Sequence, residues 1–139
     1  MKEILKVLCV FSFFIMFFAC ATTQTQQGLP AKYDLGNEPK RIDQINTFQL
    51  SSWEQVDNQS IILETNWHKY YLLVLRNPIT GVIPNLTIGI SSTISSITAG
   101  FDRIFVNEGG ITQYYVIDKI YELKDRKQAD EIKKQLLKK

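Results

Sequence analysis

The chain has 139 residues, of which 45% are apolar and 22% are charged, and its formal net charge at pH 7 is +2. These values are typical of a globular protein, and the length allows one domain but excludes a TIM barrel, a full Rossmann domain and a polytopic membrane protein. Residues 20–118 hold six basic and nine acidic residues, a net of −3, whereas residues 119–139 hold eight and four, a net of +4. The sequence therefore predicts a mildly acidic body with a basic tail.

Residues 1–19 have the features of an export signal of the lipoprotein type. Lys2 and Lys6 make the start positive, and residues 8–19 then run without a charge and contain five of the eight phenylalanines. Twelve residues suit the apolar region of a signal peptide and are too few to cross about 30 Å of hydrocarbon as a helix. We therefore expect the protein to be exported.

Two cleavage reactions fit the end of this signal. Ala19-Cys20 resembles the bacterial lipobox, in which a small residue precedes a cysteine that receives a diacylglyceryl group, although the two preceding phenylalanines depart from the usual pattern. Ala19-Cys20-Ala21 is also an A-x-A site for ordinary signal peptidase, which would release a soluble protein that begins at Thr22. We favour lipidation of Cys20, because it is the only cysteine outside the apolar segment.

Lipidation of Cys20 predicts a membrane anchor at the N-terminus. A residue other than Asp at position 21 follows the general sorting rule for outer-membrane lipoproteins. We expect the outer membrane, facing the periplasm, if Cys20 is lipidated, and otherwise the soluble periplasm. The expected partners are the membrane, reached through the lipid, and an envelope protein or polymer. Nucleic acid is not an expected partner, because an exported protein is separated from the nucleic acid of the cell.

After the signal, residues 20–42 are predicted to be a lipidated cysteine followed by a flexible tether. The stretch is polar and has no period of 2 or 3.6, and four turn-forming residues interrupt it: Gly28, Pro30, Gly36 and Pro39. The alternative is an ordered arm that packs on the domain through Leu29, Tyr33 and Leu35.

Residues 43–123 are predicted to form a β domain. Short strands separated by turns are expected at residues 48–53, 61–65, 70–75, 86–90, 103–106 and 112–123, the last with a bulge near Asp118. Residues 70–75 are apolar on both faces, which predicts a central strand. Residues 91–99 are rich in Ser and Thr and are expected to form a loop or a short helical turn.

The basic tail, residues 124–139, contains apolar residues at helical spacing. Ala129, Ile132 and Leu136 predict a helix over residues 126–138. No alternation of strand, helix and strand precedes it, which argues against a parallel sheet. The expected fold is mainly β: a small antiparallel sheet or partly closed barrel of about six strands with a C-terminal α-helix.

The order of these motifs resembles a known family. The motifs are Trp53 with Ile61-Ile62-Leu63, Tyr71-Leu72 with Leu75-Arg76-Asn77-Pro78, Ile88-Gly89 with Ser91-Ser92-Thr93, residues 101–106, and Ile117, Ile120 and Leu123. Over roughly residues 40–123 they resemble a family of small exported Gram-negative proteins of unknown function. The resemblance implies no activity. Many of its members carry a cysteine just after the proline and another in the last strand, whereas here Ile79 and Tyr115 stand at those places, so packing would have to replace the disulfide.

Motifs for catalysis or metal binding are weak. His68 is the only histidine, and neither H-x-x-x-H nor C-x-x-C occurs, so we expect a surface histidine and no metal or cofactor. A Ser-His-Asp triad could be drawn from His68, Asp102 and one of four serines, but no G-x-S-x-G motif frames any of them: Ser91, Ser92, Ser95 and Ser96. We therefore predict no catalytic residue.

A ligand or partner surface is the remaining hypothesis, with Arg76, Asp102, Arg103 and Tyr70 as its candidates. Asp102-Arg103 begins a predicted strand, where the residues either cap a turn and form a cross-strand ion pair or line such a surface with Arg76. Adjacent strand residues point to opposite faces, so one tyrosine of each pair, Tyr70-Tyr71 and Tyr114-Tyr115, is expected in the core and the other outside.

These observations favour a non-catalytic, lipid-anchored envelope protein that binds a protein or envelope partner through an edge strand or the basic helix. The alternative is a soluble periplasmic hydrolase that uses two carboxylates among Glu64, Asp102, Asp118 and Glu122. A deep pocket that joins Asp102, Arg76 and a second carboxylate would favour the hydrolase. A shallow face with an exposed apolar patch would favour binding.

Overall fold

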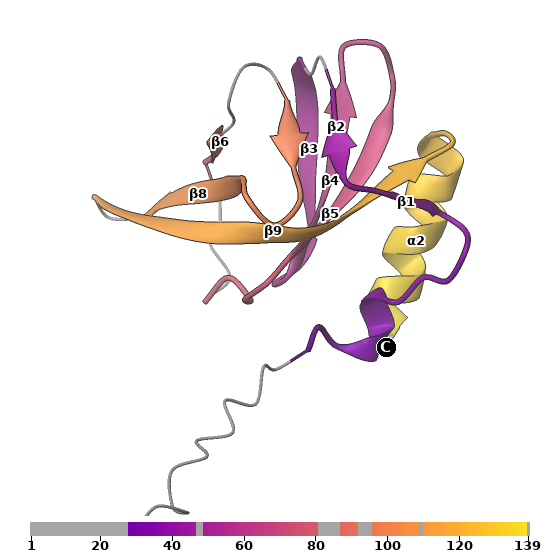
Figure 1. Cartoon of the computed structure of the whole chain (residues 1–139), viewed down its shortest axis with the longest axis horizontal. Coiled ribbons are helices and arrows are strands. Elements are labelled where there is room, and N and C mark those ends of the chain that lie inside the picture. The colour runs from indigo at the N-terminus through magenta and orange to yellow at the C-terminus, as the bar shows by residue number, and fades with distance from the viewer. Residues whose placement is uncertain (1–27, 47–48, 81–86, 92–95, 109, 139) are drawn as a thin grey trace, which may run out of the picture.

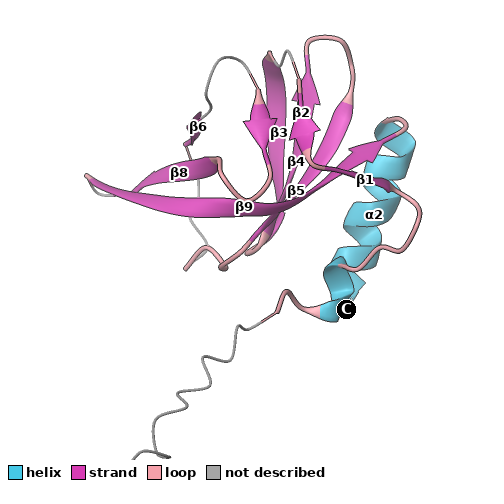
Figure 2. Ribbon diagram, viewed as in Figure 1, coloured by secondary structure: helices cyan, strands magenta, loops and turns pink. Residues whose placement is uncertain are grey.

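A curled antiparallel sheet with a helix on its outer face makes up the computed structural model (Figures 1 and 2). The structure describes residues 28–46, 49–80, 87–91, 96–108 and 110–138. The export signal and Cys20 lie outside the described residues, so lipidation of Cys20 remains a prediction.

Six strands form the curled half-barrel, in the order β3 (Leu50–Asp57), β4 (Ser60–Thr65), β5 (Tyr70–Leu75), β9 (Ile111–Leu123), β8 (Arg103–Glu108) and β6 (Ile88–Ser91). Every pair is antiparallel, as short strands joined by turns predict. Two further pairings use shorter strands: β1 (Lys40–Ile42) pairs with the end of β9, and β2 (Gln44–Ile45) pairs with β7 (Ile97–Thr98). The mainly β fold with a terminal helix is confirmed.

Strand β5 is central, as its two apolar faces predict. It pairs with β4 on one side and β9 on the other. Leu73 points into the inner core of the half-barrel, whereas Leu72 points into an outer core between the sheet and the helix, and both are fully buried. A sheet with a core on each face needs such a strand.

Strand β9 is the longest strand, and a bulge divides it. Val74 lies opposite Lys119 and Leu75 opposite Ile117, which leaves Asp118 as the extra residue and confirms the predicted bulge. Before the bulge β9 pairs with β8, and after it β9 pairs with β5 and β1. A bulge bends and twists a strand, so this one lets a single strand run through both parts of the curled sheet.

The helix α2 (Arg126–Lys138) has the predicted bounds and packs on the outer face through Ala129, Ile132 and Leu136. Its start is capped reciprocally: the Asp125 carboxylate accepts a hydrogen bond from the Gln128 N–H at 2.8 Å, and the Gln128 side chain accepts one from the Lys124 N–H at 2.7 Å. None of the described helices is long and apolar enough to cross a membrane.

Residues 28–42, which we call the arm, do not form the predicted flexible tether. They include the short 3-10 helix η2 (Ala31–Tyr33) and strand β1, and Tyr33 is fully buried in the outer core, with Leu29 and Leu35 packed beside it. This is the ordered arm of the alternative prediction. The polar composition concealed it, because only three widely spaced apolar residues attach the arm to the outer core. Residues 20–27 lie outside the described residues.

Two further strands were not predicted from the sequence. Strand β7 lies in the segment expected to be a loop or helical turn, and β2 lies just before the first predicted strand. Each has only two residues, so neither shows an alternating pattern. Their Ile45 and Ile97 side chains are buried in the inner core.

Candidate functional site

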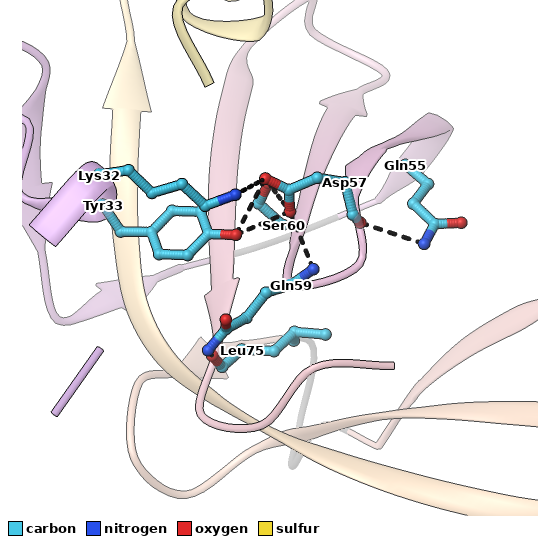
Figure 3. Close-up of polar contacts among 7 residues, drawn as sticks. All are labelled: Lys32, Tyr33, Gln55, Asp57, Gln59, Ser60 and Leu75. Carbon is cyan, nitrogen blue, oxygen red and sulfur yellow. Dashed lines mark hydrogen bonds and ion pairs between the residues drawn. The ribbon is translucent and has the colours of Figure 1, made fainter. Parts of the chain in front are cut away.

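Asp57 joins the arm to the turn between β3 and β4 (Figure 3). Its carboxylate accepts hydrogen bonds from Lys32 Nζ at 2.8 Å, Tyr33 Oη at 2.8 Å, the Gln59 N–H at 2.8 Å and Ser60 Oγ at 2.7 Å. Burial by itself would raise the pKa of Asp57, but the hydrogen bonds from Lys32, Gln59, Ser60 and Tyr33 hold it below its usual value. Burial raises the pKa of Tyr33 to about 12. All donors come from the protein, so this cluster, the Asp57 clamp, fastens the arm and leaves little room for a ligand.

A second carboxylate, Glu64, lies at the other end of β4. Its oxygens accept hydrogen bonds from Ser52 Oγ and Tyr70 Oη, each at 3.0 Å, and lie 3.0 Å from His68 Nδ1. The contact with His68, followed by those with Ser52 and Tyr70, lowers the pKa of Glu64. We call these four residues the Glu64 cluster.

The geometry of the Glu64 cluster does not suit nucleophilic catalysis. Its serine bonds the carboxylate, whereas an activated serine must bond the imidazole. The adjoining hollow, which Arg126 and Asp130 of α2 also line, has a volume of about 90 Å³, enough for only a few water molecules. The cluster therefore stiffens the edge between sheet and helix.

A wider hollow of about 440 Å³ lies beside the turn between β4 and β5. Four basic and two acidic residues are part of its lining: Lys40, His68, Lys69, Lys124, Glu38 and Glu122. Lys124 Nζ is 2.6 Å from Glu38 Oε2, and Lys40 lies opposite Glu122 in the β1–β9 ladder. Both glutamates therefore lie beside a lysine, which leaves Lys69 as the remaining lysine of this lining.

The outer face of the sheet is covered on one side only. Helix α2 packs over β3, β5 and the end of β9, and among the described residues no helix covers β6, β8 and the start of β9 (Figure 2). Phe105 of β8 lies opposite Gly89 and Tyr114 in the ladders, and the rings of Phe105 and Tyr114 are 6.1 Å apart. A Cβ at Gly89 would lie 2.0 Å from Phe105 Cζ, so the glycine leaves room for the ring. Tyr114 is 59% exposed.

Two arginines flank Val116, which lies two residues after Tyr114 on β9. The Arg76 N–H donates to the Val116 carbonyl at 2.8 Å, and Arg103 lies opposite Val116 on the other side of β9. Neighbouring strands lie about 4.8 Å apart, so the two Cα atoms are roughly 10 Å apart on one face. Arg76 Nε donates to Asp118 at 3.1 Å, and no described residue pairs with the exposed guanidinium of Arg103. We call Arg76, Arg103, Phe105, Tyr114 and Val116 the open face.

The structure divides the four predicted surface residues. Arg76 and Arg103 belong to the open face, whereas Tyr70 lies in the Glu64 cluster at the other end of β5. Asp102 caps a turn, because its carboxylate accepts a hydrogen bond from the Thr98 N–H at 2.6 Å. Of the tyrosine pairs, Tyr71 and Tyr115 are buried in the inner core, as the alternation predicted.

The open face contains residues that the sequence analysis missed. Phe105 and Val116 stood in predicted strands but carried no signal of their own. The pairing of Phe105 with Tyr114 depends on the β8–β9 register, which the sequence did not provide. The one available signal was the alternation at Tyr114-Tyr115, which places one aromatic ring outside.

The described residues do not assemble the catalytic arrangements considered from the sequence. His68 contacts Glu64 and Asp102 contacts Thr98, so the two do not share a triad, while Ser92 and Ser95 lie outside the described residues. The hollow beside Arg76 has no carboxylate in its lining: Gly28, Pro30, Gln59, Arg76, Asn77 and Pro78. Within the described part of the chain, no group of three His, Cys, Asp or Glu side chains is placed to hold a metal ion.

Comparison with known proteins identifies the family but no activity. Residues 1–139 match a family of unknown function (DUF6491), and the chain belongs to this family. No curated protein and no solved structure matches the chain. The expected resemblance to a family of unknown function is thus confirmed, over the whole chain, while export and lipidation remain predictions.

Proposed function

We propose that this member of the DUF6491 family is a non-catalytic, lipid-anchored envelope protein that binds a partner protein on its open face. The observation that carries the proposal is the pair of exposed arginines on either side of Val116, with Phe105 and Tyr114 next to them along the strands. Arginine and tyrosine are enriched where proteins bind each other, because both combine a large contact area with directed hydrogen bonds. Two guanidinium groups favour a partner with carboxylates beside an apolar segment.

The edge of β9 next to the open face supports the same proposal. Residues 111–115 pair with β8 on one side, and among the described residues no strand pairs with their other side. An extended segment of a partner can add to such an edge through backbone hydrogen bonds, while its side chains lie on the open face.

The carboxylates support a non-catalytic role. A general acid needs a raised pKa, whereas hydrogen bonds lower the pKa of both Asp57 and Glu64. Asp118 is bonded to Arg76, and Asp102 to a backbone N–H. The alternative of a periplasmic hydrolase would need a free carboxylate pair at a pocket, and no observation above favours it.

The lipid anchor is tested first, by labelling cells with a clickable fatty acid and separating the membranes. We expect label on the wild-type chain and none on the Cys20→Ala variant. An unlabelled wild-type chain in the soluble periplasm, beginning at Thr22, would disprove the anchor but leave the binding face untouched.

The binding face is tested by photocrosslinking in cells with a benzophenone amino acid at position 114. We expect a discrete crosslinked species that weakens when Arg103 is changed to Glu, because charge reversal repels an acidic partner. The matched control carries the benzophenone at Lys127, which is exposed on α2. Equal crosslinking at both positions, or no effect of Arg103→Glu, would contradict the proposal.

A further inference from the structure

The end of the domain at which the N-terminal segment joins is also the end at which α2 finishes. Figure 1 shows the C-terminal end of α2 beside η2, and Leu136 shares the outer core with Tyr33. The first described residues, Gly28 and Pro30, line a hollow with Arg76 at the end of β5. Any anchor that precedes residue 28 therefore pulls this end of the domain toward the membrane.

The distance to the proposed anchor is short. Gly28 follows Cys20 after eight residue steps. Even fully extended, eight residues span at most about 29 Å, which is less than the thickness of a bilayer with its headgroups. This limit comes from covalent geometry alone, so it holds for any conformation of the segment.

The last turns of α2 have the charge and the apolar side chain that a lipid surface attracts. After Glu131 the helix contains no acidic residue, and Lys134 and Lys138 are exposed without an ion-pair partner among the described residues. Leu137 between them is 59% exposed. The first half of the helix differs, because Asp130 and Glu131 balance its basic residues there.

We propose that the C-terminal end of α2 docks on an anionic phospholipid surface through Lys134, Lys138 and Leu137. The inference rests on the proposed lipid anchor, which keeps the domain near the bilayer, and adds an orientation to it. Lysine side chains bind anionic headgroups while Leu137 enters the boundary between headgroups and acyl chains.

The test measures the depth of residue 137 in vesicles. The processed chain is purified with Leu137→Cys carrying a bimane label, which is specific because an acylated Cys20 has no free thiol, and is reconstituted with brominated phosphatidylcholine. We expect quenching when phosphatidylglycerol is present and much less in phosphatidylcholine alone. The double variant Lys134→Gln with Lys138→Gln should remove this difference in quenching. As a control, a label placed instead at the exposed Trp67, in the turn between β4 and β5, should not be quenched.

The outcomes separate the anchor from the docking. Flotation with phosphatidylcholine vesicles reports the anchor alone. If the chain floats but residue 137 is not quenched with phosphatidylglycerol, the docking is disproved and the anchor stands. If the processed chain carries no lipid, the labelled chain beginning at Thr22 is titrated with vesicles from solution. The double lysine variant should then bind phosphatidylglycerol roughly thirtyfold more weakly, and equal binding would overturn the inference.

Discussion

The two halves of the outer face of the sheet use the same strand, β9, for different purposes. After the bulge at Asp118, Tyr121 and Leu123 are buried against α2 and the arm, and Leu72 of β5 beside them is fully buried. Before the bulge, Tyr114 points outward and is mostly exposed. One half holds the domain together, whereas the other carries apolar and basic side chains that no described helix covers.

The largest expected effect is on stability in the covered half. Leu72→Ala removes a fully buried side chain from the outer core and should lower the free energy of unfolding by about 2–5 kcal/mol. Tyr114→Ala in the open half should lower it by less than about 1 kcal/mol. Urea unfolding of the two variants measures both. Similar losses would mean that the open half is also part of the packed structure.

The Asp57 clamp should be the next most sensitive feature. Asp57→Asn removes the negative charge that Lys32 Nζ contacts at 2.8 Å and should destabilise the domain by about 1–3 kcal/mol. It should also expose the arm to limited proteolysis near η2. The matched control is Asn58→Asp, which also changes the charge of this turn by one unit but leaves the Asp57 carboxylate in place. An unchanged proteolysis pattern in Asp57→Asn would show that apolar packing alone holds the arm.

The clamp also makes a prediction for pH. The pKa of Asp57 is lowered in the folded protein, so its stabilisation is fully present above the unfolded value near 3.9 and is lost as the pH falls through the lower folded value. We expect the free energy of unfolding to fall below about pH 4, and to fall less steeply in Asp57→Asn. Parallel pH curves for the two proteins would exclude this contribution.

In the open half, Gly89→Ala separates surface shape from stability. Its new Cβ would clash with the tip of the Phe105 ring, which can swing outward, so the loss of stability should stay below about 1 kcal/mol. The displaced ring should nevertheless reduce crosslinking from position 114. Unaltered crosslinking would place the partner away from Phe105.

A local backbone effect is expected at the turn between β4 and β5. His68 has φ of 53°, in the left-handed region that favours glycine. His68→Gly should therefore be more stable than His68→Ala by about 1 kcal/mol, because both lose the contact with Glu64 and only glycine relieves the strain. Thermal unfolding of the pair measures the difference, and equal midpoints would mean that the turn is not strained.

Local patterns predicted much of the covered half. The helix α2 was expected at its observed bounds because Ala129, Ile132 and Leu136 recur within three turns. Strand β5 was expected to be central because both of its faces are apolar, and it has a core on each. Both signals lie within a dozen consecutive residues, so no knowledge of distant partners is needed.

Contacts between distant residues decided the rest. The sequence predicted a tether because local patterns do not reveal the partners of Tyr33. Tyr33 contacts Asp57 and Tyr121, which are 24 and 88 residues away. The predicted surface was only partly right for the same reason: Arg76 and Arg103 lie on either side of β9, whereas Tyr70 lies with Glu64. Such neighbours depend on strand order and register.

Charge, period and composition over short stretches were enough to predict the antiparallel sheet, its central strand and the terminal helix, and they also predict the export signal, which stays a prediction. Tertiary contacts were needed to show that the arm is ordered and that Phe105 and Tyr114 lie beside Val116 and its two flanking arginines, on a face that no described helix covers. Strands β8 and β9 form a hairpin, but β5 and β9 are far apart in the chain, so Arg76 and Arg103 share a face only once the long-range pairing of β5 with β9 has formed.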